Sequence, residues 1–272
     1  MQPSQLYVRE AGAGPGVVCL HSNASSSGQW RALMDALSPK FRVLAPDSYG
    51  AGKSPEWPSD RVITLADEVA LIEPALARAD APLALIGHSY GAAIALKVAL
   101  ANPGRVRALA LYEPTLFSLI EAEKPAPNEA DGIREAVARS VAALEAGDRD
   151  AAAGHFIDYW MGAGAWRRTP EPRKPPIAAS IANVRRWGHA LTTEPAPLAA
   201  FRSLDIPVLY MVGKRSTASA HGVARLLTGA LPRVEVVEFE KLGHMGPVTH
   251  PDPVNAAILD FLKRVLALAL PG

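Results

Sequence analysis

Short, continuously apolar segments alternate with helical patterns along most of the chain, and this alternation constrains the fold more than any other feature. The apolar segments are 16–22, 41–47, 82–88, 105–113, 206–213 and 233–240. Apolar strands separated by helices are typical of a mostly parallel sheet that helices cover on both faces. The sequence therefore predicts an α/β fold with such a sheet at its centre.

Helical patterns fill the connections between these segments. We expect helices over 26–39, 64–80, 90–103 and 217–230, a short one near 196–203, and a terminal one from Pro251. In the second of these, Thr64 and Asp67 have the spacing of a capping box. Pro74 lies inside the same pattern, and we expect it to kink or break that helix.

The alternation stops after Pro114 and resumes near residue 196. Between them lie three helical segments, 128–146, 148–161 and 177–192, which are joined by stretches rich in proline and glycine. A helical insertion at this point would lie over the carboxyl ends of the strands. We therefore expect a core of residues 1–114 and 196–272 and an all-helical cap of residues 115–195.

Composition limits the class of partner. The formal net charge of +1 gives no long-range attraction to nucleic acid or to an anionic membrane. Cys19 is the only cysteine, so an intrachain disulfide is impossible. The N-terminal MQPSQLYVRE lacks the basic and apolar regions of a signal peptide, and no apolar run reaches the length of a membrane span. We expect a cytoplasmic protein without a nucleic-acid or membrane partner.

Two glycine patterns do not fit nucleotide binding. The segment GAGKS at 50–54 has Asp47 where a phosphate-binding loop requires glycine. The segment GAGPG at 12–16 precedes a strand, whereas a dinucleotide-binding turn follows one. No two histidines have metal-ligand spacing. We therefore expect neither a cofactor nor a metal.

The segment Gly87-His88-Ser89-Tyr90-Gly91 has the G-x-S-x-G pattern and lies between a predicted strand and a predicted helix. That context is typical of a nucleophile elbow. A strand that turns at once into a helix holds the serine in a strained conformation and exposes its hydroxyl at the helix N-terminus. Ser89 is therefore the candidate nucleophile.

A serine nucleophile needs a base, and His244 is the best candidate among the seven histidines. It lies just after the last predicted strand, between Gly243 and Gly246, in a loop that can reach Ser89. His250 lies closer to the final helix and is the weaker candidate. His88 adjoins the nucleophile but is expected to point away from it.

With these motifs, the chain resembles the α/β-hydrolase family over nearly its whole length. The resemblance rests on LHSNASSSGQW (20–30), APDSYGAGKSP (45–55), GHSYG (87–91), LALYEPTLF (109–117) and GHMGP (243–247). It implies an oxyanion hole formed by the backbone N–H groups of Tyr90 and Asn23. The family usually has His-Gly-x where this chain has His21-Ser22-Asn23, a departure that affects the backbone of this loop.

The acid of the triad is missing from its customary place. Most of the family carries Asp in a G-x-x-D pattern after the strand that follows the cap, but this chain has Ser216 there, three residues after Gly213. Haloalkane dehalogenase-like members place the acid at the end of the preceding strand, and Glu113 occupies that position here. The resemblance thus favours Glu113 as the acid. A histidine held by Ser216, or by no carboxylate, is the alternative.

A serine nucleophile favours acyl chemistry over the aspartate-based dehalogenase and epoxide hydrolase mechanisms. We expect a carboxylesterase that cleaves small to medium uncharged esters. The alternatives are a carbon–carbon bond hydrolase or lactonase with the same triad, and a non-catalytic sensor that binds a ligand under the cap. Aromatic residues of the cap line either a substrate pocket or the cap's own core; they include Phe117, Tyr159, Trp160 and Trp187. The sequence does not indicate the oligomeric state.

Overall fold

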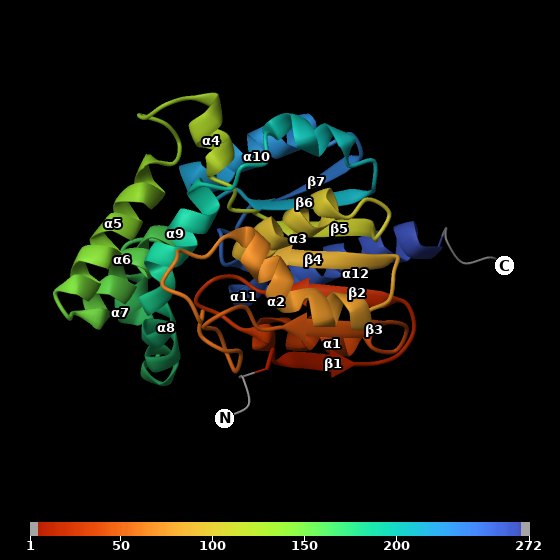
Figure 1. Ribbon diagram of the computed structural model, residues 1–272, viewed down its shortest axis with the longest axis horizontal. Coiled ribbons are helices and arrows are strands. Elements are labelled where there is room, and N and C mark those ends of the chain that lie inside the picture. Colours follow the sequence, from red (N-terminus) through yellow and green to blue (C-terminus); the bar gives the residue numbers. More distant parts are fainter. Residues whose placement is uncertain (1–4, 268–272) are drawn as a thin grey trace.

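A seven-stranded sheet forms the centre of the computed structural model, which describes residues 5–267 (Figure 1). Its order is β1-β3-β2-β4-β5-β6-β7, and every neighbouring pair is parallel except β1 with β3. Residues 1–4 and 268–272, the outer ends of the expected core, lie outside the described residues. The mostly parallel sheet expected from the sequence is confirmed. The strands are β1 Val8–Ala11, β2 Gly16–Leu20, β3 Arg42–Pro46, β4 Leu83–His88, β5 Val106–Tyr112, β6 Val208–Gly213 and β7 Val234–Phe239.

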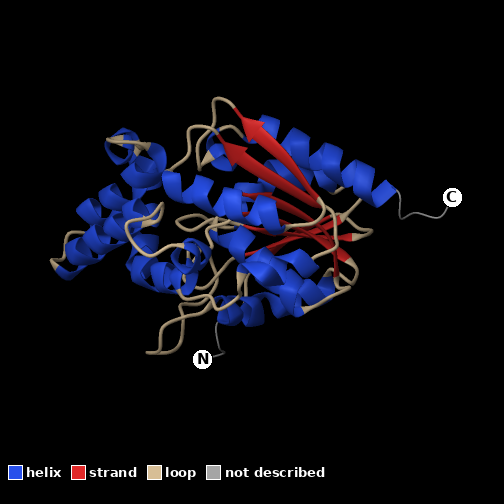
Figure 2. Cartoon of the chain, turned by 90° about the horizontal axis from the view of Figure 1, so that it is seen from above, coloured by secondary structure: helices blue, strands red, loops and turns tan. Residues whose placement is uncertain are grey.

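Helices cover both faces of the sheet because its central strands are apolar on both sides (Figure 2). In β4, Leu83 and Leu85 belong to one hydrophobic cluster, and the intervening Ala84 and Ile86 belong to another. The first cluster includes residues of α2 (Leu65–Arg78), α3 (Tyr90–Ala101) and α10 (Ala218–Ala230). The second includes residues of α1 (Arg31–Leu37) and α12 (Pro251–Ala267).

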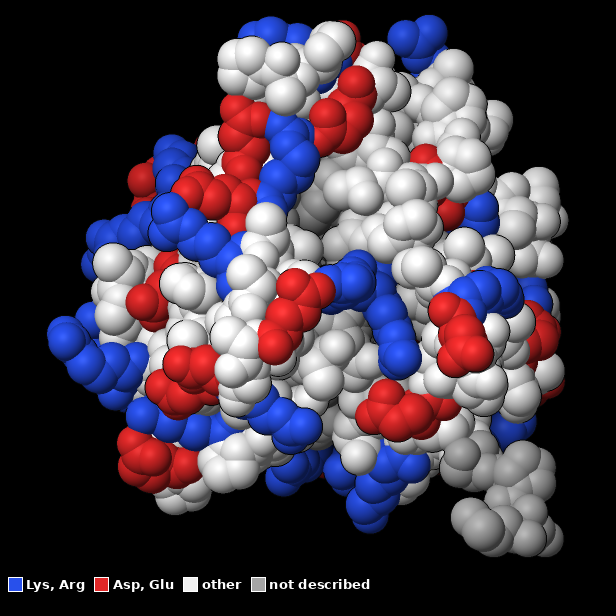
Figure 3. All heavy atoms as spheres, turned by 60° about the vertical axis from the view of Figure 1, so that its left-hand side comes forward, with Lys and Arg blue, Asp and Glu red and all other residues white. Residues whose placement is uncertain are grey.

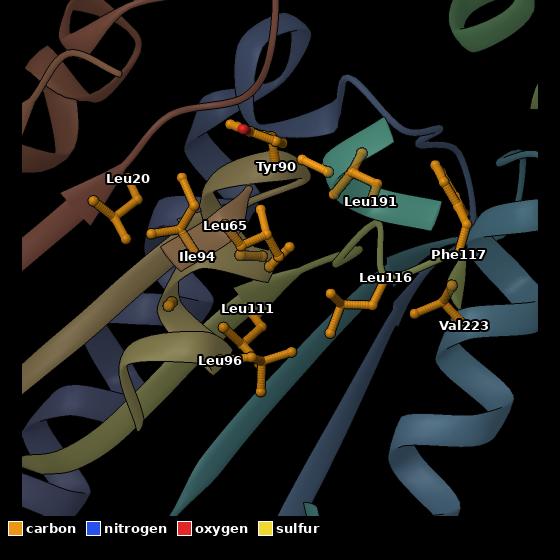
Figure 4. Packing of buried hydrophobic residues seen from close by; sticks show 14 of the residues in the cluster. Leu20, Leu65, Tyr90, Ile94, Leu96, Leu111, Leu116, Phe117, Leu191 and Val223 are labelled. Atoms are coloured by element: carbon orange, nitrogen blue, oxygen red, sulfur yellow. The ribbon is translucent and has the colours of Figure 1, made fainter. Parts of the chain in front are cut away.

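Helices between β5 and β6 form the group that we call the cap helices, on the left in Figure 1. Most of their buried apolar side chains belong to the same hydrophobic cluster as those of α2, α3 and α10, and Figure 4 shows Leu191 of α9 among the members of that cluster. The cap helices therefore share a core with one face of the sheet. They are α4 Ser118–Glu123, α5 Asp131–Glu145, α6 Arg149–Met161, α7 Ala165–Arg168, α8 Lys174–Ser180 and α9 Val184–Thr192. The boundaries of a separate cap domain stay a prediction.

The expected elements differ from the observed ones in a few places. Strand β1 was not expected, because this short, half-exposed edge strand has no continuous apolar run. The expected helix over 177–192 is divided into α8 and α9 by a 3₁₀ turn at Ile181–Asn183. Further 3₁₀ turns cover Ser27–Trp30, Glu171–Arg173 and Leu198–Ser203.

The capping box of α2 is present as expected, but the helix does not break at Pro74. Pro74 and Ala70, whose carbonyl loses its helical partner, both lie on the exposed side of α2. Water can therefore satisfy that carbonyl while Ile72 and Leu76 stay buried on the other side.

The surface over the cap helices carries Lys and Arg side chains interleaved with Asp and Glu side chains (Figure 3). Arg134, for example, pairs with both Glu121 and Asp131. This mixture agrees with a net charge close to zero. Within residues 5–267, no helix is both long and apolar enough to cross a bilayer.

Candidate active site

Ser89 lies at the sharp turn between β4 and α3. Its backbone has φ 56° and ψ −115°, a conformation that non-glycine residues rarely adopt. Gly87 and Gly91 allow the turn because a Cβ atom on either would lie within 2.5 Å of neighbouring backbone atoms. The sharp strand-to-helix turn expected from the sequence is therefore present in the backbone.

Gly91 allows the elbow to lie against the end of β2. A Cβ atom there would lie 2.3 Å from the carbonyl oxygen of Leu20 and 2.6 Å from that of His21. Backbone cannot yield as a flexible side chain would, so we expect Gly91→Ala to reduce the free energy of unfolding by about 3 kcal/mol. Urea denaturation measures this change.

Gly229 provides the matched control for Gly91. It lies in α10, and beyond its chain neighbours and the adjacent backbone of that helix, no atom of the described residues lies within 4 Å of the position its Cβ would take. Gly229→Ala should leave stability unchanged or raise it by up to about 1 kcal/mol, because alanine has the higher helix propensity. Equal stability of the two variants would show that the elbow tolerates a side chain at Gly91.

Ser89, His244 and Glu113 form one continuous line of hydrogen bonds. His244 Nε2 lies 2.9 Å from Ser89 Oγ, and His244 Nδ1 lies 2.6 Å from Glu113 Oε2. All three side chains are buried. The loop that carries His244 is fixed by Tyr112, whose hydroxyl donates to the carbonyl oxygen of Gly243 at 2.8 Å.

Glu113 lies directly after β5, with φ 44° and no exposed surface. While Oε2 faces His244, Oε1 accepts hydrogen bonds from the N–H of Gly213 at 2.7 Å and from the hydroxyl of Ser216 at 2.5 Å. The serine in the customary acid position thus donates to the carboxylate at the end of the neighbouring strand. Both oxygens of this buried carboxylate therefore have hydrogen-bond partners.

A second chain of hydrogen bonds connects the loop after β2 with the loop of His244. Gln29 Oε1 accepts from both the N–H and the hydroxyl of Ser22, at 3.2 and 3.1 Å. Gln29 Nε2 lies 3.0 Å from His88 Nδ1, and His88 Nε2 lies 2.8 Å from the carbonyl oxygen of His244. Burial holds the pKa of His88 well below its ordinary value, so this imidazole is neutral.

This second chain explains two expectations from the sequence. His88 points away from Ser89, as expected, and binds the backbone of His244 instead. Ser22, which replaces the usual glycine, is anchored by Gln29. Sequence reasoning missed Gln29, because its partner His88 lies 59 residues away along the chain and no local pattern marks Gln29.

Of the two proposed oxyanion donors, Tyr90 directly follows Ser89 in the chain. Tyr90 is the first residue of α3, where the helix provides no carbonyl partner for the backbone N–H. Its side chain is buried, and its hydroxyl donates to Glu68 at 3.2 Å. Burial raises the pKa of Glu68 to about 8. Asn23 is half-buried and lines the same cavity as Ser89.

Asp47 connects two loops by hydrogen bonds to their backbone. Its Oδ1 accepts from the N–H of Ser27 at 2.6 Å, and its Oδ2 accepts from the N–H of Lys53 at 2.9 Å. Within the described part of the chain, no group of His, Cys, Asp and Glu side chains has the arrangement of a metal site.

A cavity of about 1350 Å³ opens above Ser89 and His244, beneath the cap helices. Of the predicted pocket residues, Phe117, Trp160 and Trp187 line it. Tyr159 does not: its hydroxyl lies 2.7 Å from Ser219 Oγ, so the ring connects α6 to α10. The cavity is lined by further apolar groups and by charged ones, including Ile133, Val137, Ile157, Leu191, Arg31, Arg168, Arg173 and Glu56.

A family model described as alpha/beta hydrolase fold matches residues 15–251. The chain belongs to this family. Among curated relatives, it is 24% identical to the pimeloyl-[acyl-carrier protein] methyl ester esterase of Nitrosomonas europaea, over 92% of this chain and 96% of that protein.

Solved α/β-hydrolase structures share the fold at low identity. An alpha/beta hydrolase from Sphaerobacter thermophilus superposes with a TM-score of 0.74 at 24% identity, over 94% of this chain and 96% of that one. The enol-lactonase from Burkholderia xenovorans gives 0.73 at 19% identity, over 95% and 96% of the two chains. The relatives are hydrolases of several kinds, so the family is clear and the bond that is cleaved is a separate question.

Proposed function

We propose that this α/β-hydrolase is a serine hydrolase that cleaves carboxylic esters through an acyl-enzyme. The observation that carries the proposal is the buried line from Ser89 through His244 to Glu113. Each hydrogen bond in it has the length that a nucleophile, its base and the group that orients the base require. The similarity to a methyl ester esterase over nearly the whole chain supports the choice of esters.

In the first half of the reaction, Ser89 Oγ attacks the ester carbonyl carbon while His244 Nε2 accepts its proton. The carbonyl oxygen becomes an oxyanion, which the N–H groups of Tyr90 and Asn23 stabilise. Glu113 holds the Nδ1 proton and stabilises the imidazolium. When the carbon–oxygen bond breaks, His244 returns the proton to the leaving alcohol, and the acyl group stays on Ser89.

In the second half, water enters and gives a proton to His244 as its oxygen attacks the acyl-enzyme. Collapse of this intermediate releases the carboxylic acid and returns the proton to Ser89. The apolar wall of the cavity suits an uncharged acyl or alkyl group. Its volume lies above the usual range of ligand pockets, so a medium-sized ester fits better than the smallest ones.

A fluorophosphonate label, with turnover of p-nitrophenyl esters, tests the proposal. We expect the label to attach to Ser89, to abolish hydrolysis, and to be absent from Ser89→Ala. An unlabelled Ser89 would favour a non-catalytic sensor. A labelled protein that cleaves no ester would point to lactones or carbon–carbon bonds. A panel of neutral and carboxylate-bearing esters with graded acyl chains then defines the substrate, since both apolar and arginine side chains line the cavity.

A further inference from the structure

The indole of Trp160 stacks on the imidazole of His244. The ring centroids are 3.8 Å apart, and the ring planes differ by 23°. Trp160 belongs to α6, a cap helix, while His244 follows the last strand of the sheet. A side chain of a cap helix thus stacks against one face of the proposed base.

Trp160 is held firmly in this position. It is 8% exposed and packs against Phe117, Phe156 and Tyr159. The hydroxyl of Tyr159, the preceding residue, fixes α6 to α10 through Ser219. The stacked arrangement is therefore built into the packing of the cap helices.

Stacking at this distance favours the charged form of the imidazole. Two neutral aromatic rings prefer offset or edge-to-face arrangements, because their negative faces repel. A cation above the face of an indole is attracted, and the attraction is largest where water is excluded. The other groups around His244 are Glu113 at Nδ1, Ser89 at Nε2, and the ring of His88 with its centroid 5.3 Å away.

We infer that Trp160 acts through His244, as a positioning residue that stabilises the imidazolium formed when Ser89 loses its proton. Its indole stabilises the imidazolium in addition to the negative charge of Glu113, and it keeps water from that face of the imidazole. Catalysis then depends on the cap helices being in place over the sheet. The kinetic consequence of this inference rests on the proposed function. The effect of Trp160 on His244 can be measured without any substrate.

NMR titration of His244 without substrate tests the inference. The comparison is between the wild type, Trp160→Phe, Trp160→Leu and Trp187→Leu, with the His244 signal assigned from its absence in His244→Gln. Leucine keeps position 160 apolar but removes the aromatic ring. Phenylalanine keeps an aromatic ring that attracts a cation less strongly than an indole does. Trp187 lines the same cavity and packs on Phe156, so it controls for loss of a large apolar side chain.

We expect the pKa of His244 to fall in the order Trp, Phe, Leu at position 160, and to be unchanged in Trp187→Leu. With an ester substrate, Trp160→Leu should lower kcat about 3- to 30-fold. The acidic limb of the pH profile of kcat/KM for this variant should move to lower pH, because a His244 with a lower pKa loses its proton at a lower pH. Trp160→Leu should therefore show both a lower kcat and an acidic limb at lower pH.

An unchanged or higher pKa of His244 in both Trp160 variants would overturn the inference. So would equal losses of kcat in Trp160→Leu and Trp187→Leu with unchanged pH profiles. If no ester is cleaved, the titration still decides the matter. Should esters be cleaved while the pKa of His244 stays fixed, the inference about Trp160 fails and the proposed function remains.

Discussion

Replacing Ser89 with alanine should lower kcat for ester hydrolysis by about 10⁶-fold, the loss seen when a triad serine is removed from a serine hydrolase. Among the described residues, the Ser89 hydroxyl is the only hydrogen-bond partner of His244 Nε2, at 2.9 Å. Without it no acyl-enzyme forms, and only binding and oxyanion stabilisation remain. Steady-state kinetics with a p-nitrophenyl ester measures the loss.

The same reasoning predicts strong non-additivity. His244→Gln should cost about as much as Ser89→Ala, and the double variant should be no worse than either, because the two side chains act as one unit. His250→Gln is the control: this histidine is exposed and should be dispensable. Losses that multiply in the double variant would contradict a shared step of Ser89 and His244. A large loss of kcat in His250→Gln would contradict the choice of His244 as the base.

Replacing Glu113 with glutamine should lower kcat by about 10⁴-fold while the fold stays intact, by analogy with the same change in another triad. The N–H of Gly213 and the hydroxyl of Ser216 both need an acceptor, so the amide oxygen of the introduced side chain would turn to them. The amide NH₂ would then face His244 Nδ1. His244 would have to carry its proton on Nε2, and it could no longer accept the proton of Ser89.

Ser216→Ala is the matched control for Glu113→Gln. It removes one hydrogen bond from the carboxylate but leaves the contact between Glu113 and His244, so we expect a loss of kcat of about tenfold or less. Thermal unfolding of both variants shows whether the fold is kept. Near-full activity in Glu113→Gln together with a large loss in Ser216→Ala would mean that the acid was assigned to the wrong residue.

The parts of the site that local patterns encode could be predicted from the sequence. The elbow at Ser89 requires only a strand, a helix and two glycines at fixed spacing, and the parallel sheet requires only repeated apolar runs. Glu113 was assigned through the resemblance to haloalkane dehalogenase-like members, which place the acid at this strand end, and its unusual backbone conformation was not expected. Which strand ends meet in space, and so which side chains reach His244, does not follow from spacing along the chain.

The contacts that depend on packing between distant segments could not be predicted. Tyr159 and Trp160 are adjacent aromatic residues of α6, yet one bonds to Ser219 and the other covers His244. Which of them faces the site depends on how α6 is rotated against α10 and the sheet. The link from Ser22 and Gln29 through His88 to His244 likewise joins three segments that lie far apart along the chain, and no local pattern marks Gln29.

The position of the Nδ1 proton of His244 tests the central claim most directly. Selective ¹⁵N labelling of histidine, with His244→Gln to identify the signals, gives the tautomer of the neutral ring. We predict a proton on Nδ1 in the wild type, held by Glu113, and a shift of that proton to Nε2 in Glu113→Gln. A wild-type ring protonated on Nε2, or a tautomer that does not respond to the change at Glu113, would contradict the account.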